Sequence, residues 1–243
     1  MAALRIDILT IFPEMFEPTL SASIPGRARD AGLVEWIITD IRRFALNKHN
    51  KVDDRPFGGG PGMVMTCQPL WDCVQSIESS DPRPTTRVLM TPQGRPLTQA
   101  LVEELAGKPR LLLIAGHYEG IDERVVQRLA PLEVSMGDFV VSGGELPAML
   151  LADAVIRLLP GALGHEDSAG QDSFSPVEAG KGGLERRLLD CPHYTRPRVW
   201  EGIEAPEVLV SGDHQKVAAW RLQQRLDRTR ERRPDLLEGG TQE

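Results

Sequence analysis

The feature that most restricts the fold is the alternation of strand-like and helix-like stretches over the first three-quarters of the chain. Four apolar stretches predict strands, at residues 4–12, 33–39, 87–91 and 111–115. The last two are short continuous runs that end at Pro92 and Gly116, which is typical of strands buried in a parallel sheet. Helical spacing of apolar residues predicts two helices, at residues 98–107 and 122–130. This order indicates an α/β fold with a largely parallel sheet.

The clearest predicted helix covers residues 145–159, where Pro160 and Gly161 are expected to stop it. Its predicted apolar face consists of Leu146, Met149, Leu150, Val155, Leu158 and Leu159. Glu145, Asp153 and Arg157 are expected to share a polar stripe on this helix. Because Asp153 and Arg157 are four residues apart, they could simply form a surface ion pair.

The remaining quarter has a different composition, which suggests a second domain. Residues 161–187 are rich in Gly, Ser, Asp and Glu and predict a flexible linker between a domain at 1–160 and a smaller one at 188–243. Within the smaller domain, residues 214–233 predict a basic amphipathic helix. The expected C-terminal domain is therefore small and helical.

Charge is distributed unevenly along the 243 residues. The net charge is −7, yet Arg186 to Arg233 carries eleven basic and seven acidic residues and is therefore about +4, which leaves about −11 elsewhere. A local basic surface is what contacts with nucleic-acid phosphates require. A solvated helix face rich in arginine would have the same composition, and composition does not separate the two interpretations.

Composition also restricts metal sites and location. Cys67, Cys73 and Cys191 are odd in number and lack zinc-site spacing, and the five histidines are scattered, so we expect free thiols and no structural metal. No apolar run is long enough to span a membrane, and the N-terminus lacks the pattern of a signal peptide. We therefore expect a cytoplasmic protein with no membrane partner.

Four glycine-centred loops mark the candidate binding regions, at residues 58–62, 91–94, 116–120 and 142–145. The last three are expected at the carboxyl ends of strands, where open α/β sheets bind ligands. Any one of them could be a plain tight turn, but three in succession favour one shared site. The chain has neither a P-loop nor a Gly-x-Gly-x-x-Gly motif, and the loops contain no lysine. They suit a nucleoside with a neutral or cationic tail better than a polyphosphate.

Four longer strings carry a family resemblance: Asp53–Met63 (DDRPFGGGPGM), Gly116–Arg124 (GHYEGIDER), Gly137–Pro147 (GDFVVSGGELP) and Asp190–Pro197 (DCPHYTRP). Together they resemble the bacterial tRNA (guanine-N(1)-)-methyltransferases, a family of the SPOUT superfamily, from about Ile6 to Pro234. The resemblance implies a homodimer whose N-terminal domain contains a deep trefoil knot. True knots are nearly absent among proteins, so this expectation depends on the resemblance alone.

The resemblance also implies the ligands. S-adenosylmethionine, the methyl donor, would lie in the knot loops, and tRNA would be the acceptor, at the guanine on the 3′ side of the anticodon. The reaction in this family can depend on Mg²⁺, for which the sequence indicates no site. The implied contacts to S-adenosylmethionine come from Thr91, Pro92, Gly94, Gly116, Tyr118, Glu119, Gly120, Met136, Gly137, Asp138, Phe139, Val140, Val141, Gly143 and Gly144.

Asp172 is implied as the general base and Arg157 as its electrophilic partner. The chemistry agrees, because N(1) of neutral guanine carries a proton, and charge develops on the neighbouring carbonyl oxygen when that proton leaves. A linker residue such as Asp172 could become ordered over the substrate and exclude water. The alternatives are a solvated linker carboxylate for Asp172 and the surface ion pair with Asp153 for Arg157.

Two departures from the family pattern and two other functions remain to be weighed. Residues 175–187 are longer than the usual connection and predict a mobile loop beside Asp172, and longer family members continue well past Pro234, which predicts a smaller tRNA footprint here. The chain could instead methylate another RNA base or ribose, or bind RNA without catalysis. Neither ribose methylation nor mere binding needs a base and a cation beside a purine, so Asp172 and Arg157 favour guanine methylation.

Overall fold

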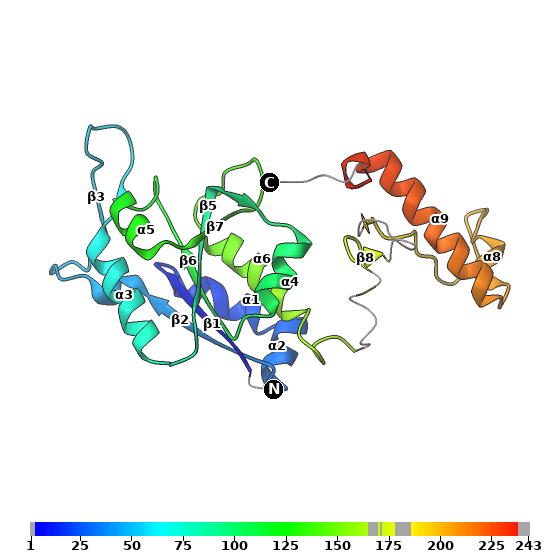
Figure 1. Ribbon diagram of the computed structural model, residues 1–243, viewed down its shortest axis with the longest axis horizontal. Coiled ribbons are helices and arrows are strands. Elements are labelled where there is room, and N and C mark those ends of the chain that lie inside the picture. Colours follow the sequence, from blue (N-terminus) through cyan, green and yellow to red (C-terminus); the bar gives the residue numbers. More distant parts are fainter. Residues whose placement is uncertain (1–2, 165–169, 171, 178–185, 238–243) are drawn as a thin grey trace. The chain divides into compact units, whose positions relative to one another are not determined.

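The computed structural model describes residues 3–164, 170, 172–177 and 186–237, which form two compact units, Met1–Glu166 and Asp167–Glu243 (Figure 1). The first unit contains a five-stranded sheet with the strand order β2-β1-β6-β5-β7. Every neighbouring pair in this sheet is parallel. The strands are β1 (Leu4–Thr10), β2 (Val34–Asp40), β5 (Thr86–Pro96), β6 (Arg110–Ala115) and β7 (Leu132–Ser135).

Helices cover both faces of the sheet (Figure 1). One face is covered by α1 (Phe16–Leu20), α2 (Ser23–Asp30), α4 (Gln99–Ala106) and α6 (Glu145–Ile156). The other is covered by α3 (Cys67–Ser79), α5 (Glu123–Leu129) and the 3-10 helix η2 (Ile41–Phe44). A 3-10 turn, η1 (Pro13–Met15), and a small hairpin of β3 (Asp53–Asp54) and β4 (Val64–Met65) complete the unit. Each face buries its own apolar cluster, so the central strands β1 and β6 are buried throughout.

The predicted α/β alternation is confirmed in this unit. The four predicted strands correspond to β1, β2, β5 and β6, and the two predicted helices to α4 and α5. Thr98 caps α4, because its hydroxyl accepts a hydrogen bond from the Leu101 amide at 3.3 Å. The sequence did not indicate β7, which is only four residues long and includes the charged Glu133.

The prediction for the helix at 145–159 is wrong in two respects. Helix α6 ends at Ile156, three residues before the predicted end, and Arg157 is its C-cap. Its buried face includes Ala148, Leu151 and Ala152, whereas the predicted core residues Leu146 and Leu150 are 58% and 54% exposed. Glu145, expected on a polar stripe, is instead buried. The helix is apolar on all sides, so its sequence period does not reveal which side faces the sheet.

A buried ion pair fixes the sheet at its amino end. Arg110 and Asp7 are both fully buried, and the Arg110 Nε lies 2.7 Å from the Asp7 carboxylate. The remaining Arg110 donors reach the carbonyl oxygens of Ile77 at 2.7 Å and Asp81 at 2.8 Å. Arg5 forms a second ion pair with Asp7, at 2.9 Å. Buried charges are tolerated only when they are paired and hydrogen-bonded in this way.

The second unit contains short elements around one long helix. They are β8 (Pro176–Val177) paired with β9 (Arg186–Arg187), β10 (Val199–Trp200) paired with β11 (Ile203–Glu204), α8 (Glu207–Val210), α9 (His214–Arg232) and η3 (Pro234–Leu236). Helix α9 confirms the predicted basic helix. Asp213 caps it by accepting a hydrogen bond from the Lys216 amide at 3.1 Å.

The predicted linker at 161–187 is described only in part. Residues 172–177 and 186–187 are hydrogen-bonded into the second unit, where the Phe174 amide donates to the Leu188 carbonyl at 2.7 Å. Residues 165–169, 171 and 178–185, which include most of the expected insert, lie outside the described residues. No helix among the described residues is both long and apolar enough to cross a bilayer.

Candidate functional site

A cavity of about 270 Å³ lies where β5, β6 and β7 end their regular pairing. Three loops provide most of its wall: residues 91–93 lie within β5, residues 116–121 follow β6, and residues 136–144 follow β7. The residues that line it are Leu89–Gln93, Gly116–Ile121, Glu123, Val126, Glu133–Met136, Phe139–Gly144 and Pro147. Three of the four predicted glycine loops therefore contribute to one shared site.

The first loop is a bulge in β5 rather than a turn after the strand, which corrects the sequence prediction. The pairing of β5 with β7 shifts register between Met90 and Arg95, and residues 91–93 line the cavity. Gly94 does not line it. A side chain at Gly94 would collide with the backbone of Glu133 and Val134, so glycine here allows β5 to approach β7 closely.

The second loop, 116–120, is held by the segment after the Gly58–Gly62 loop. The Glu119 amide donates to the Met63 carbonyl and the Met65 amide to the Gly120 carbonyl, both at 2.9 Å. Tyr118 adopts a positive φ of 64° in this loop. The Gly58–Gly62 loop itself does not line the cavity, but the residues that follow it fix the loop that does.

The third loop returns to the sheet through Gly143 and Gly144, which pass directly against the end of β6. The Gly144 amide donates to the Gly116 carbonyl at 2.6 Å. A Cβ atom on Gly144 would lie 2.8 Å from the Ala115 Cα, closer than nonbonded carbon atoms approach. This pair does not follow a strand directly, as the sequence had suggested, because β7 ends at Ser135 and residues 136–142 intervene.

Glu145 is a buried acid that contacts the end of β1 and the second loop. Its carboxylate accepts a hydrogen bond from the Thr10 hydroxyl at 2.9 Å and lies 3.4 Å from the His117 Nδ1. The His117 ring is also 5.0 Å from the Phe12 ring, between centroids. Sequence reasoning assigned no role to His117 and placed Glu145 on a polar stripe, because its spacing puts it on the same side of the helix as Asp153 and Arg157.

The charge of the cavity wall is acidic. Its described lining residues include Glu119, Glu123 and Glu133 and no lysine or arginine. Burial raises the pKa of the Tyr118 phenol further above its usual range, and the phenol is protonated and able to donate at neutral pH. Phe139 adds an aromatic surface that is 59% exposed. Such a wall disfavours a polyphosphate and accepts a neutral or cationic ligand.

Most of the fifteen predicted contact residues line this cavity, and Gly94, Gly137 and Asp138 do not. Lining residues that the sequence did not indicate include Leu89, Met90, Gln93, His117, Glu123, Glu133 and Pro147. Several of them belong to strands or helices, where sequence patterns predict packing rather than binding. Their side chains reach the cavity because the strands end there.

The two predicted catalytic residues lie in different units. Arg157 is the half-buried C-cap of α6 in the first unit, and its amide donates to the Asp153 carbonyl at 3.0 Å. Asp172 belongs to the second unit, where its carbonyl accepts from the Ser175 amide at 3.2 Å and from Arg225 at 3.5 Å. Two hydrogen bonds to its carbonyl thus hold the Asp172 backbone against its own unit.

Comparisons with known proteins show the family of the chain. Residues 4–239 match the family model described as "tRNA (Guanine-1)-methyltransferase TrmD". The chain belongs to this family. It is 51% identical over 236 residues to a tRNA (guanine-N(1)-)-methyltransferase of Moorella thermoacetica, with 96% of this chain and 90% of the relative covered. It is also 51% identical over 238 residues to the protein of the same name from Pseudomonas fluorescens SBW25, with 98% and 91% covered.

Family membership confirms the resemblance seen in the four sequence strings. It also confirms the enzyme class, a tRNA methyltransferase that acts on guanine. The cavity that the three loops form together is the feature of this structure that a methyl donor could use.

Proposed function

We propose that the enzyme transfers a methyl group from S-adenosylmethionine to N(1) of the guanine on the 3′ side of the tRNA anticodon. The observation that carries this proposal is the convergence of three loops, 91–93, 116–121 and 135–144, on one acidic cavity. Family membership supports the reaction, and the names of the relatives support N(1) of a guanine as the atom that is methylated.

The charge and the side chains of the cavity wall suit S-adenosylmethionine. The sulfonium of this donor is cationic and is favoured near the carboxylates of Glu119, Glu123 and Glu133. Because Gly116 and Gly120 have no side chain, a nucleoside can approach the loop backbone closely there, and Phe139 or Tyr118 offers an aromatic surface for its adenine. The remaining predicted contacts, Gly94, Gly137 and Asp138, would support these loops without lining the cavity.

We also propose that the first unit carries the family's trefoil knot. The third loop passes against the end of β6, with the Gly144 amide bonded to the Gly116 carbonyl at 2.6 Å, before the chain continues into α6. Gly143 and Gly144 permit this close passage, because a side chain on either would collide with residues 115–117. Such a close passage of two chain segments is compatible with a chain that threads a loop.

In the proposed reaction, a carboxylate oxygen of Asp172 takes the proton from guanine N(1). The electron pair of N(1) then attacks the methyl carbon, the carbon–sulfur bond breaks, and the sulfonium becomes a neutral thioether. Arg157 stabilises the negative charge that develops on the guanine carbonyl oxygen. No further oxidant or metal is needed to balance this transfer, and we assign no site to Mg²⁺.

We propose that the protein is a homodimer. In this family, each active site is built from two chains. Helix α6 presents Leu146 and Leu150 to solvent, and Val140 in the third cavity loop is 83% exposed. Leu146 and Leu150 are four residues apart and therefore lie on the same side of α6, the helix that Arg157 caps. Apolar side chains repeated at helical spacing on an exposed face are typical of a protein contact.

We propose that tRNA contacts the second unit through its phosphates. Arg221, Arg225, Arg228 and Arg232 recur at helical spacing and share one side of α9. Arg225 and Arg228 donate to the carbonyl oxygens of Leu189 and Asp190 at 3.4 Å and 3.5 Å, so this side of the helix faces the segment that supports Asp172. A tRNA substrate also favours a cytoplasmic location.

The decisive test uses unmodified tRNA and a methyl donor labelled in its methyl group. After incubation, the position of the label is mapped in the RNA. We expect N(1)-methylguanine at the position 3′ to the anticodon. Label on ribose or on another base would support the alternative SPOUT reaction, and unlabelled RNA from protein that binds both ligands would support a non-catalytic binding module.

The dimer is tested by light scattering at micromolar concentration. We expect twice the 26.8 kDa of one chain. Leu146→Glu with Leu150→Glu should shift the mass towards one chain, whereas Leu222→Glu, on the exposed surface of α9, should not. A wild-type mass of one chain would contradict the proposal.

A further inference from the structure

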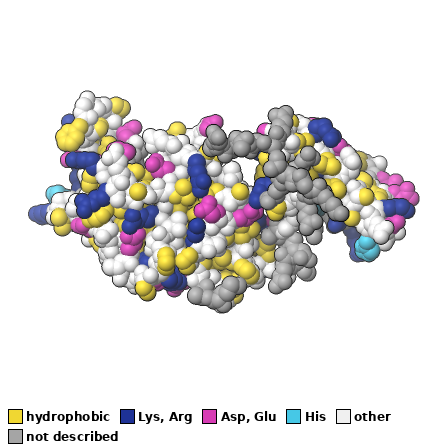
Figure 2. All heavy atoms as spheres, in the orientation of Figure 1, with side chains coloured by type: hydrophobic (Ala, Val, Ile, Leu, Met, Phe, Trp, Pro, Cys, Tyr) yellow, Lys and Arg dark blue, Asp and Glu magenta, His cyan; other side chains and the backbone are white. Residues whose placement is uncertain are grey.

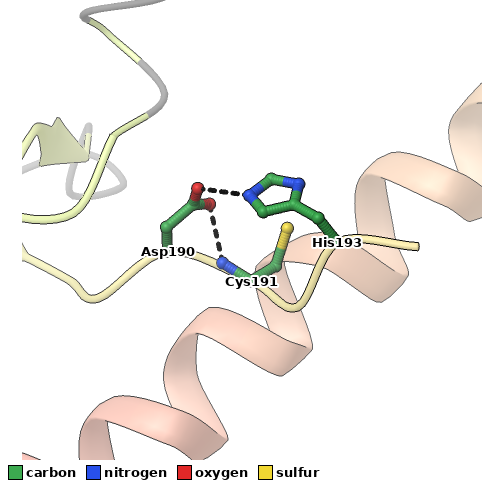
Figure 3. A group of neighbouring side chains, drawn as sticks. All are labelled: Asp190, Cys191 and His193. Atoms are coloured by element: carbon green, nitrogen blue, oxygen red, sulfur yellow. Dashed lines mark hydrogen bonds and ion pairs between the residues drawn. The ribbon is translucent and has the colours of Figure 1, made fainter. Parts of the chain in front are cut away.

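Asp190, Cys191 and His193 form a compact group of three different donor types in the second unit (Figure 3). We propose that this group binds one Zn²⁺ ion. The motif that contains it, Asp190–Pro197, is part of the family resemblance, but the proposed methyl transfer uses none of its side chains. The described residues contain no other such group.

The geometry brings the three ligand atoms close together. A carboxylate oxygen, the Cys191 Sγ and a His193 ring nitrogen all lie within 4.8 Å of one another. The His193 Nε2 is already 2.8 Å from the Asp190 Oδ2, and the Cys191 amide fixes the other carboxylate oxygen at 2.6 Å. Figure 3 shows the Cys191 sulfur turned towards the imidazole. Only small side-chain movements would bring all three atoms to zinc bond lengths of about 2.0–2.3 Å.

The donor set selects the metal. Sulfur, imidazole nitrogen and carboxylate oxygen together are typical of zinc, whereas Mg²⁺ prefers oxygen ligands alone. Three protein ligands leave a fourth tetrahedral position for water. This site is therefore unrelated to a Mg²⁺ requirement of the methyl transfer.

Charge balance is compatible with a dication. On binding, the Cys191 thiol would release its proton to solvent, and His193 would coordinate as the neutral imidazole. The thiolate and the Asp190 carboxylate together offset the charge of Zn²⁺. This local neutrality lets the site tolerate Arg228, which donates to the Asp190 carbonyl at 3.5 Å.

Binding would have a consequence for the loop that carries Asp172. The Asp190 amide donates to the Ser173 hydroxyl at 2.9 Å, and the Phe174 amide donates to the Leu188 carbonyl at 2.7 Å. The segment 188–193 is thus the direct support of residues 173–174. A metal that fixes Asp190 and His193 would therefore brace this loop in the absence of tRNA.

The first experiment measures metal binding alone. Protein stripped with a chelator is equilibrated with ZnCl₂, separated from free metal by gel filtration, and assayed for zinc. We expect one zinc per chain, and with CoCl₂ a cobalt–thiolate charge-transfer band. Cys191→Ser and His193→Ala should lose both, whereas the controls Cys67→Ser and His214→Ala should keep them. His193 is 76% exposed, so its replacement leaves the fold intact even if the buried Cys191 position does not tolerate serine.

Wild-type protein that binds no zinc, or zinc that is still bound by His193→Ala, would overturn the proposal. The group would then be no more than an ion pair between Asp190 and His193.

The second experiment measures hydrogen exchange with and without zinc. Exchange at the Phe174 and Asp190 amides should slow in the wild-type protein and stay unchanged in His193→Ala. Bound zinc without this protection would overturn the bracing role. Neither readout depends on methyl transfer, so both remain informative if Asp172 proves not to be the base.

Discussion

The two units of this chain differ in how many of their residues are buried. The first unit buries an apolar cluster on each face of a parallel sheet and closes one end of that sheet with the Arg110–Asp7 ion pair. In the second, the buried residues among those described are few, namely Ser175, Leu188, Cys191 and Thr229. Carboxylates and basic side chains are interspersed on the visible face of both units (Figure 2).

This difference matches the division of work that we propose. A cavity built from three loops needs a rigid frame, because its walls must keep their spacing before any ligand binds. A loop that closes over a large RNA substrate benefits from a smaller and less constrained support. The comparison therefore predicts that changes in the first unit affect folding and cofactor binding, whereas changes in the second affect RNA binding and chemistry.

The largest effect on stability is expected from Arg110→Met in the first unit. It leaves the Asp7 carboxylate buried with one partner fewer, and breaking such a pair costs about 3–5 kcal/mol. Urea unfolding would be followed with Trp200 and Trp220 replaced by Phe, so that Trp36 and Trp71 report on the first unit alone. The control Lys108→Met breaks only the exposed pair with Glu104 and should cost less than about 1 kcal/mol. Equal losses in the two variants would contradict the proposed importance of the buried pair.

A smaller effect, confined to the cavity, is expected from Gly144→Ala. The added methyl group would press on Ala115, and overpacking of this kind costs about 1–3 kcal/mol. If the strain is relieved by moving the third loop, the affinity for S-adenosylmethionine falls about 10-fold to 100-fold. Calorimetry without RNA measures this, with Gly164→Ala as the control, because nothing lies within 4 Å of a Cβ there. Unchanged affinity would remove the third loop from the binding site.

The smallest effect is expected from Arg221→Ala combined with Arg232→Ala on α9. Loss of two phosphate contacts should lower the slope of log affinity for tRNA against log salt by about 1.4–1.8. Arg230→Ala is the matched control, because Arg230 lies on the opposite side of the helix and pairs with Asp227 at 2.9 Å. Affinity for S-adenosylmethionine should not change in either variant. An equal change of slope in the control would show that the helix acts only through its net charge.

The sequence predicted regular elements well where local signals are strong. The strand β6 is a continuous apolar run, and helical spacing of apolar residues located α4 and α5. It failed where the outcome depends on the neighbours of a residue. Helix α6 is apolar all round, so only the tertiary structure shows that Leu146 is exposed and Glu145 buried.

The candidate site was predictable to a similar extent. Glycine strings indicated the loops at 116–120 and 142–145, because close backbone passage requires glycine. His117 and Glu133 were not indicated as lining residues. They reach the cavity only because β5, β6 and β7, which are separated in the sequence, lie side by side in the sheet. The group at Asp190, Cys191 and His193 was missed because its spacing matches no common zinc motif.

The central claim is that the first unit binds the methyl donor while Asp172 in the second performs the proton transfer. Single-turnover methyl transfer by Asp172→Asn, with enzyme in excess over tRNA, tests it most directly. Asparagine keeps the size and a hydrogen-bond acceptor but cannot take a proton at neutral pH. We expect the rate to fall about 100-fold or more, with unchanged binding of S-adenosylmethionine. A single-turnover rate close to that of the wild-type enzyme would contradict the claim.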